Sequence, residues 1–374
     1  MTLKSVGIIA EYDPFHHGHQ FQLEAAKEKT GADVVVVVMS SNWTQRGEPA
    51  IYDKWTRTQM ALNGGADLVV ELPIQSAVQP ASIFAEKAIE LITELKCDYL
   101  SFGSEHSEID FNQLKEIVIN SDSDLFNDYQ KTFPQIFQAV LQKQLNVDVS
   151  SPNDMLGFWY AQAAQRYNPE LKLFPISRIE SEHNDSVLKH RVSSGKAIRL
   201  AIKNGQSQVD DFLPSSVDDL QPLFWDDYWP FLQYQINQSS LEELRNIYQM
   251  SAGLEHLFKK VAIKAKNFAE FIASIKSKRY TYTRIQRLCV YILFKITDQD
   301  IIDSQSMLRI LGMNNQGKEY LSQLKKTCSV PIISKIDKEA FEKQLYLECK
   351  AGTLTGMILK KHEDLYRFPI ILNN

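Results

Sequence analysis

Hydrophobic positions in the first part of the chain form short continuous runs, separated by longer stretches of mixed apolar and polar residues. The runs lie at 5–10, 32–39, 66–72 and 98–103, and the second contains five consecutive valines. Short uninterrupted runs rich in β-branched residues are typical of strands buried on both faces, as in a parallel sheet. A further run at 171–177 predicts a fifth strand of the same kind.

The stretches between these runs have the spacing of amphipathic helices. At 82–95, apolar residues recur at intervals of three and four, which predicts a helix with one buried face. Similar patterns predict helices at 18–29, 53–63 and 154–166. Alternation of strands and helices predicts an α/β fold, here a Rossmann-like, doubly wound parallel sheet.

The pattern changes after about residue 214. Residues 217–230 are rich in Asp, Trp and Pro and are interpreted as a connector. Apolar residues recur with helical spacing at 241–249, 253–275 and 282–296, and a short apolar segment at 330–333 is suited to a strand. We therefore predict two domains, an α/β catalytic domain at 1–215 and a mainly helical domain at 216–374.

Length and composition fit this division. The 374 residues are enough for two domains, and the net charge of −5 does not favour a nucleic-acid partner for the chain as a whole. A local basic face can still bind RNA. The four cysteines form no CxxC pair, which argues against a zinc ribbon. No apolar stretch approaches the length of a membrane span, and no signal peptide precedes the first strand. We expect a cytoplasmic protein with reduced thiols.

The most informative polar segment, Asp13–His19, joins the first predicted strand to the first predicted helix. Ligands of α/β sheets bind beyond the carboxyl ends of the strands, and the N-terminus of a helix favours phosphate. His16 and His19 are three residues apart, so one turn brings both imidazoles near one point. We predict that they are catalytic and stabilise charge on the α-phosphate of a nucleotide. A surface histidine group or a zinc site is the alternative, but no third ligand has a fitting spacing.

Residues 7–19, Gly-Ile-Ile-Ala-Glu-Tyr-Asp-Pro-Phe-His-His-Gly-His, resemble the signature of the nucleotidyltransferase superfamily with the His-x-Gly-His motif. Within that superfamily the string is most similar to the bacterial tRNA(Met) cytidine acetate ligases. The resemblance implies an enzyme that activates acetate with ATP as acetyl-adenylate. It also implies that the enzyme then acetylates N4 of the wobble cytidine of elongator tRNA(Met). Mg²⁺ is expected with the polyphosphate, although the sequence shows no ligand cluster and we predict no metal-binding residue.

The same resemblance implies ATP contacts along the first strand and its loop and at three later positions. Gly103 and Arg178 end predicted strands, where backbone and guanidinium groups can reach a ligand. Asn153 opens a predicted helix, and the residues alone favour a helix-capping role there. The implied ATP-binding residues are Gly7, Ile8, Ile9, Ala10, Glu11, Tyr12, Asp13, Pro14, Phe15, His16, His17, Gly18, His19, Gln20, Gly103, Asn153 and Arg178.

Two further segments fit this interpretation. Ser193–Arg199 resembles the superfamily's second motif, a helix start whose hydroxyl, N–H and cationic groups can hold the leaving pyrophosphate. Gly195 and Lys196 stand where the motif usually has small or hydroxyl residues, so no role is assigned to Lys196. Arg46, in a Gly- and Pro-containing loop after the second strand, is a candidate contact for phosphate or RNA.

The basic residues gather in one part of the chain. Residues 255–295 contain ten Lys or Arg and two Glu, and the densest part is Lys276–Arg284, where two tyrosines lie between basic residues. Such a segment can neutralise phosphates and stack on unpaired bases, and a solvated helix face with core tyrosines is the alternative. With the resemblance, we predict tRNA contacts at Lys276, Lys278 and Arg279.

Two other functions remain open at this point. The first keeps the fold but makes a nucleotide-activated small molecule, as other members of the superfamily do. The second is a non-enzymatic protein that senses nucleotides or binds RNA. Product analysis with ATP, with and without tRNA, distinguishes the first of these from an acetate ligase. The second predicts that His16→Ala leaves the physiological activity intact.

Overall fold

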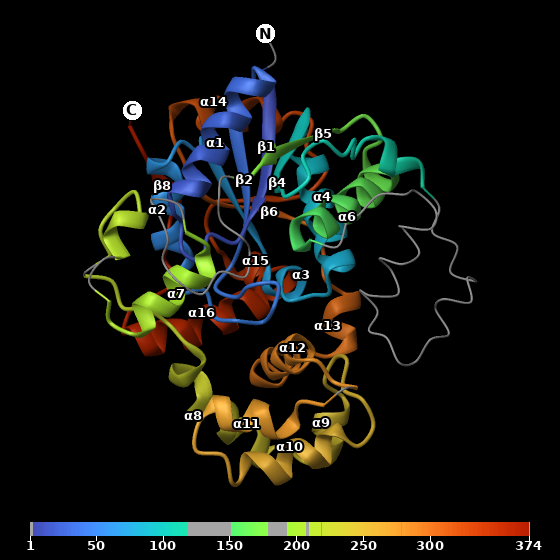
Figure 1. The fold of residues 1–374 in the computed structure, drawn as a ribbon, viewed down its shortest axis with the longest axis vertical. Coiled ribbons are helices and arrows are strands. Elements are labelled where there is room, and N and C mark those ends of the chain that lie inside the picture. Colours follow the sequence, from blue (N-terminus) through green and yellow to red (C-terminus); the bar gives the residue numbers. More distant parts are fainter. Residues whose placement is uncertain are drawn as a thin grey trace.

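The computed structural model describes residues 3–117, 151–178, 193–206, 209–217, 219–277 and 279–373. In this part of the chain, eight strands form one sheet in the order β5-β4-β1-β2-β3-β6-β7, with β8 paired to β6 (Figure 1). The strands are β1 (Ser5–Ala10), β2 (Val34–Ser40), β3 (Leu68–Leu72), β4 (Tyr99–Ser104), β5 (Lys172–Ser177), β6 (Leu308–Met313), β7 (Ile332–Ile333) and β8 (Ile370–Ile371).

The first five strands pair in parallel, as the apolar runs predict. Every residue of β2 is buried, and its valines alternate between two cores. Val36 packs in the core on one face of the sheet, whereas Val35 and Val37 pack in the core on the other. This two-sided burial is the reason that β2 is a continuous apolar run instead of an alternating one.

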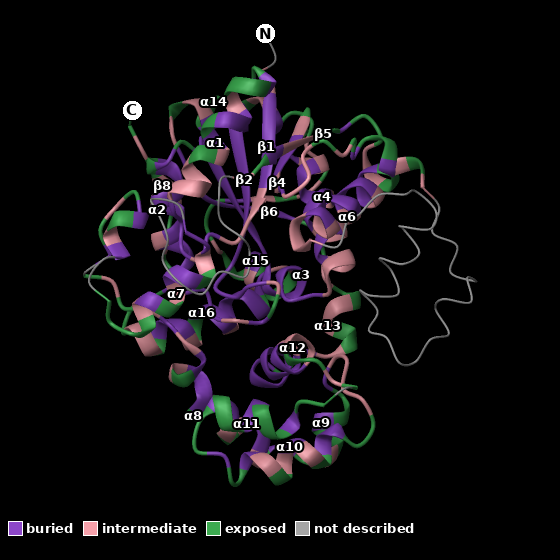
Figure 2. Cartoon of the chain, in the orientation of Figure 1, coloured by how far each residue is buried: buried purple, intermediate pink, exposed green. Residues whose placement is uncertain are grey.

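Helices cover both faces of the sheet (Figure 2), which confirms the doubly wound α/β fold. The strand order changes direction at β1, because β2 and β4 lie on opposite sides of it. Ligands of such sheets bind beyond the strands at this point. The helices that belong to the two faces are α1 (His17–Thr30), α2 (Lys54–Asn63), α4 (Ala81–Glu94), α6 (Pro152–Tyr167), α7 (Gly195–Lys203) and α14 (Asn315–Leu324).

A group of helices beyond the carboxyl ends of the parallel strands has a core of its own (Figures 1 and 2). Trp43, from the loop after β2, is also buried in this core, against Trp225 and Tyr228. We call this group the helical bundle. It consists of α8 (Trp225–Gln238), α9 (Leu241–Arg245), α10 (Leu254–Ala262), α11 (Phe268–Ile275) and α12 (Tyr282–Leu293).

Two predictions about this region need correction. The connector predicted at 217–230 ends earlier, because α8 begins at Trp225 and its aromatic residues pack in the core of the bundle. The single helical period predicted at 253–275 is divided into α10 and α11. A strand lies within the apolar piece at 330–333, as predicted.

After the bundle the chain returns to the sheet, where β6 pairs antiparallel with β3. The division between residues 215 and 216 stays a prediction, and three strands that follow it belong to the main sheet. The remaining short elements and the last long helix are α3 (Ile74–Ala77), η1 (Gln113–Glu116), η3 (Val209–Phe212), α13 (Asp298–Ile302), α15 (Lys338–Lys343) and α16 (Tyr346–Leu359). Among the described helices, none has the length and apolar character needed to cross a bilayer.

A buried group of charged side chains joins this C-terminal part to the sheet. The Lys54 ammonium lies 2.6 Å from carboxylate oxygens of both Glu71 and Asp364. The Arg309 guanidinium lies 2.9 Å and 2.8 Å from the same two carboxylates. Glu348 on α16 lies 3.4 Å from Lys54 and accepts a hydrogen bond from the backbone of the α3 segment. The charges of Lys54, Arg309, Glu71 and Asp364 are therefore paired, as burial requires.

Candidate nucleotide site

The histidine loop begins where β1 ends and continues into the first turn of α1. His16 is the N-cap of α1, and its Nδ1 accepts a hydrogen bond from the backbone N–H of Gly18 at 3.1 Å. The backbone N–H of His16 in turn donates to Nδ1 of His19 at 3.3 Å. Two histidines therefore occupy the places that Ser and Glu fill in an ordinary capping box.

These two hydrogen bonds determine which ring nitrogen carries the proton. Because Nδ1 of each imidazole accepts, the neutral ring has its proton on Nε2. Burial lowers the pKa of His16 to about 3, and the positive charge of Arg178 contributes to the shift. Burial also lowers the pKa of His19 well below its usual value, with His16 and Arg178 contributing. At neutral pH each histidine therefore presents one neutral N–H donor.

The two rings stack with centroids 3.7 Å apart and planes 21° apart, so the structure brings both imidazoles to one point, as predicted. Tyr12 and Phe15 support them from the buried side. Their ring centroids lie 4.9 Å and 5.9 Å from that of His19 and 4.8 Å from each other. Rings held by such contacts can stabilise developing charge without rearrangement.

The three later positions of the predicted ATP set lie together at the neighbouring strand ends. Gly103 in β4 is opposite Ile176 in β5, and a Cβ added at Gly103 would lie 3.5 Å from Cγ of Arg178. Asn153 donates to the Glu105 carboxylate at 2.6 Å, and Nε of Arg178 lies 4.0 Å from the same oxygen. The charge of Arg178 acts on both His16 and His19, so this group and the histidine loop face one site.

The capping role expected for Asn153 is wrong. Ser151 is the N-cap of α6, where its hydroxyl accepts from the backbone N–H of Asp154 at 3.3 Å. Pro152 follows in the first helical position, which it commonly occupies, so the cap falls one residue earlier. Asn153 instead binds Glu105. A role for Glu105 was not predicted, because in the sequence it is simply an acidic residue directly after the end of a buried strand.

The second motif lies directly against the histidine loop. Ser194 is the N-cap of α7, which confirms that the motif opens a helix. A Cβ added at Gly195 would lie 3.0 Å from the carbonyl oxygen of Asp13, so a residue without a side chain fits best here. Arg199 donates to the Asp13 carboxylate at 2.6 Å and to the carbonyl of Pro49 at 3.1 Å. The guanidinium therefore holds the loop, and a contact with pyrophosphate stays a prediction.

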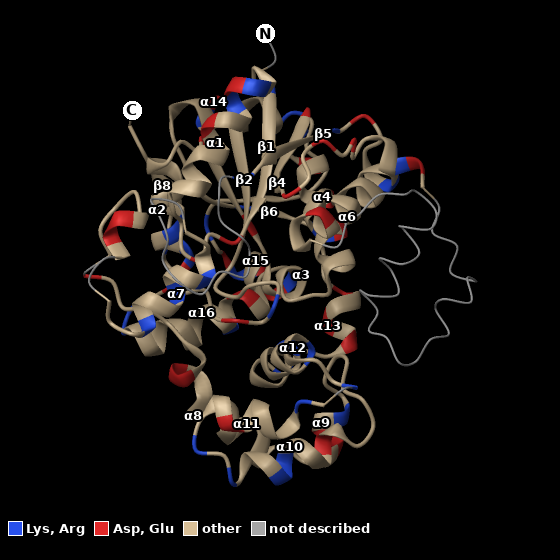
Figure 3. Cartoon of the chain, in the orientation of Figure 1, with Lys and Arg blue, Asp and Glu red and all other residues tan. Residues whose placement is uncertain are grey.

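The three predicted RNA-binding residues that the structure describes lie on the exposed surface, in two places. Arg46 is exposed in the loop between β2 and α2. Lys276 and Arg279 are exposed between α11 and α12, whereas Lys278 lies outside the described residues. Arg279 and Arg284 both lie over the ring of Tyr280, at 5.4 Å and 5.2 Å from its centroid. Figure 3 shows cationic residues along this part of the bundle.

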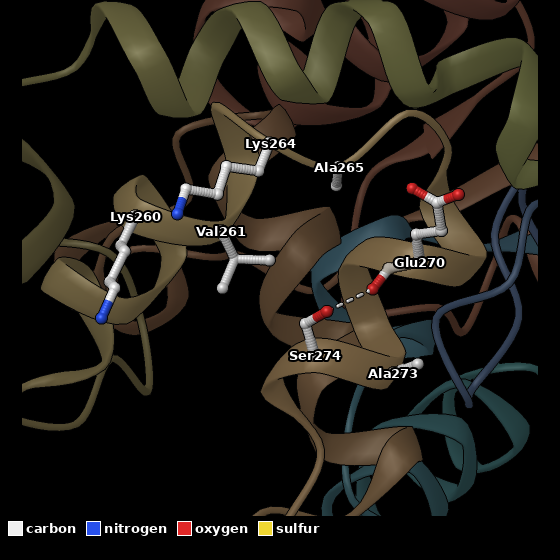
Figure 4. A pocket seen from close by; sticks show the side chains of 7 residues that line it. All are labelled: Lys260, Val261, Lys264, Ala265, Glu270, Ala273 and Ser274. Carbon is white, nitrogen blue, oxygen red and sulfur yellow. Dashed lines mark hydrogen bonds between the residues drawn. The ribbon is translucent and has the colours of Figure 1, made fainter.

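A separate hollow lies between α10 and α11 (Figure 4). Lys260 and Lys264 line one side of it, and Glu270 and Ser274 line the other. None of its residues belongs to the histidine loop or to the strand ends, so it is distinct from the candidate nucleotide site. Among the described residues, no group of three or more His, Cys, Asp or Glu side chains is placed to hold a metal ion.

Comparison with known proteins identifies the family. The model of the HIGH Nucleotidyl Transferase family matches residues 3–367. The tRNA(Met) cytidine acetate ligase of Levilactobacillus brevis is 40% identical over 377 residues, which cover 99% of this chain and 98% of the relative. The ligase of the same name from Latilactobacillus sakei is 42% identical, with 98% and 97% covered. The chain belongs to the tRNA(Met) cytidine acetate ligase family.

The fold agrees with this assignment. The crystal structure of Thermotoga maritima TmcAL in its apo form superposes with a TM-score of 0.90, at 27% identity and with all of both chains covered. A second crystal structure of that protein, bound with alpha-thio ATP, gives a TM-score of 0.88. The resemblance inferred from residues 7–19 is therefore confirmed, and so is the nucleotidyltransferase type of the α/β fold.

Proposed function

We propose that this protein is an ATP-dependent ligase that acetylates N4 of the wobble cytidine of elongator tRNA(Met). The observation that carries the proposal is the pair of neutral imidazole donors at the start of α1. This pair lies in a chain whose relatives, matched over nearly their full length, bear the name tRNA(Met) cytidine acetate ligase. We propose that the reaction proceeds in two steps.

In the first step, a carboxylate oxygen of acetate attacks the α-phosphorus of ATP. The bond from that phosphorus to the bridging oxygen breaks, pyrophosphate leaves, and acetyl-adenylate forms. The Nε2–H groups of His16 and His19 donate to the oxygens of the α-phosphate as negative charge grows there. The N-terminus of α1 adds backbone N–H groups. No protein side chain forms a covalent bond.

The remaining ATP contacts are proposed for the strand ends beside this loop. Gly103 lets the nucleotide approach the backbone, Asn153 offers an amide group, and Arg178 supplies a guanidinium that suits phosphate. Mg²⁺ would enter on the polyphosphate and offset its charge, because the described residues provide no ligand cluster for it.

In the second step, the N4 amine of the cytidine attacks the acetyl carbonyl, AMP leaves, and the nitrogen loses a proton as the amide forms. We place the RNA along the exposed cations Arg46, Lys276 and Arg279, together with Lys278. Their charges would neutralise phosphates of the RNA backbone. Since ATP and tRNA are found in the cytoplasm, we place the enzyme there.

Acetate-dependent exchange of labelled pyrophosphate into ATP tests the first step. We expect exchange with acetate and none when the carboxylic acid is omitted. Exchange with a different acid and none with acetate would overturn the substrate assignment. A nucleotidyltransferase that makes another product is recognised by transfer of the nucleotide to that acceptor without tRNA, and a non-enzymatic protein by the absence of exchange with any acid.

A further inference from the structure

We propose that the ring of Tyr282 is the platform on which the target cytidine stacks while its N4 amine attacks the acetyl group. This inference rests on the tRNA acetylation proposed above. It names a positioning residue for the second step, in a part of the chain far from the histidine motif in sequence.

Tyr282 is the first residue of α12 and is placed by a standard helix start. Thr281 caps the helix, and its hydroxyl accepts from the backbone N–H of Arg284 at 3.4 Å. Residues four apart lie on the same side of a helix, so Tyr282 lies one turn before Gln286 on the same side of α12. The backbone of Gln286 is in contact with Gly47, since a Cβ added to Gly47 would lie 2.9 Å from its carbonyl carbon.

The loop that contains Gly47 connects α12 to the nucleotide site. Glu48 lies 3.8 Å from Nε of Arg199, and Nη1 of Arg199 lies 2.6 Å from the Asp13 carboxylate. Burial raises the pKa of Tyr282 to about 12, and the charges of Glu48 and Arg199 act on its hydroxyl in opposite directions. Together with the contact between Gln286 and Gly47, these influences place Tyr282 on the side of α12 that faces the loop containing Gly47 and Glu48.

Tyr282 is not part of the buried core of the helical bundle. Tyr228 and Tyr291 are fully buried, whereas Tyr282 is 42% exposed at the surface of the bundle. The neighbouring Tyr280 already has Arg279 and Arg284 over its ring. Tyr282 thus combines an accessible ring with nearby cations for phosphates.

The chemistry of the second step needs such a residue. A wobble base lies in a single-stranded loop and is stacked on its neighbours, so it must leave the stack before N4 can reach the acetyl carbonyl. An aromatic ring replaces the lost stacking and holds the base at a defined distance from the carbonyl. Tyr282, which is close enough for the charges of Glu48 and Arg199 to act on it, offers this exposed ring.

The test compares Tyr282→Ala, Tyr282→Phe and a control, Tyr234→Ala, in the full-length protein. Tyr234 on α8 is 66% exposed and has no part in the site. For each variant we would measure kcat/KM for tRNA acetylation and the rate of acetate-dependent pyrophosphate exchange. We expect the ratio of acetylation to exchange to fall about 5- to 150-fold in Tyr282→Ala. Tyr282→Phe should keep the unchanged protein's ratio, because the ring and not the hydroxyl stacks.

An unchanged ratio in Tyr282→Ala overturns the inference. An equal loss in Tyr282→Phe also overturns it, because the hydroxyl would then be the important group. Failure of the unchanged protein to acetylate tRNA is a separate result, since it contradicts the proposed function before any variant is compared.

Discussion

The guanidinium of Arg199 lies 2.6 Å from the carboxylate of Asp13, so the second motif is fastened directly to the histidine loop. Both side chains are largely buried, and the same Asp13 oxygen also accepts the backbone N–H of Ile51 at 2.7 Å. One carboxylate therefore joins three separate segments around the nucleotide site. The ion pair explains how residues far apart in sequence form one rigid site.

A double-mutant cycle measures this relationship. We expect Arg199→Gln and Asp13→Asn each to lower the free energy of unfolding, with a coupling of about 0.5–3 kcal/mol between them. The half-exposed pair Lys203–Asp226, at 2.9 Å on the surface, is a matched control with an expected coupling of about 0.2–1 kcal/mol. A coupling for Arg199–Asp13 no larger than that of the control would contradict a structural role for the pair.

Replacing His16 by Asn separates its two roles. The Asn side chain can still accept the N–H of Gly18 and cap α1, but it lacks the Nε2–H donor. We expect His16→Asn to fold normally and to lose about 100- to 1000-fold in the rate of acetate-dependent pyrophosphate exchange. His256→Asn, at an exposed position on α10, is the control and should keep full activity. Normal exchange in His16→Asn would show that its imidazole does not stabilise the transition state.

Gly47 is the point where the loop after β2 contacts the helical bundle. Its φ is +79°, and a Cβ there would lie 2.8 Å from the backbone nitrogen of Arg287. The Trp225 indole also donates to the carbonyl of Gly47 at 3.0 Å. Gly205, with φ +66° and no atom near its Cβ position, controls for the cost of the backbone conformation alone.

We therefore expect Gly47→Ala to lower the free energy of unfolding by about 1–3 kcal/mol more than Gly205→Ala, because only the first change forces an overlap. Denaturant unfolding of both variants checks this difference. Equal losses would show that the loop moves away from α12 at little cost.

The buried carboxyl of Glu348 predicts a pH-dependent stability. Burial raises its pKa to about 8, and the nearby charge of Glu71 adds to the shift. Between the ordinary Glu value and pH 8, the folded protein keeps this proton and the unfolded chain does not. The stabilisation is therefore complete at low pH and is lost as the pH rises, at about 1.4 kcal/mol per pH unit for one proton.

In Glu348→Gln this group no longer titrates. We expect the variant to gain stability relative to the unchanged protein as the pH is raised from 5 to about 8. Free energies of unfolding measured for both proteins across that pH range test whether the difference in stability changes in this direction. A difference between the two proteins that is independent of pH would contradict the raised pKa.

Much of the fold follows from local patterns in the sequence. The strands β1 to β5 and the helices α1, α2, α4 and α6 could be predicted, because each is a continuous apolar run or has amphipathic spacing. The strand β6 was not predicted, since the charge of Arg309 interrupts its apolar pattern and is neutralised only by distant carboxylates. Helix α8 was missed because Asp226, Asp227 and Pro230 were interpreted as connector residues. Acidic residues in a first turn favour a helix start.

The candidate site likewise contains some contacts that could be predicted from the sequence and others that could not. The close approach of the His16 and His19 imidazoles could be predicted, because residues three apart at the start of a helix lie on the same turn. The links from Asn153 to Glu105 and from Arg199 to Asp13 could not, because they join segments 48 and 186 residues apart. Tertiary packing alone determines such pairs.

Acetylation of the wobble cytidine is examined most directly by incubating the protein with labelled acetate, ATP and elongator tRNA(Met) and then analysing the nucleosides. We expect label in N4-acetylcytidine at the wobble position, with no label when ATP is omitted and a strong loss in His16→Asn. Label recovered in a different nucleotide-activated compound, with unmodified tRNA, would contradict this expectation.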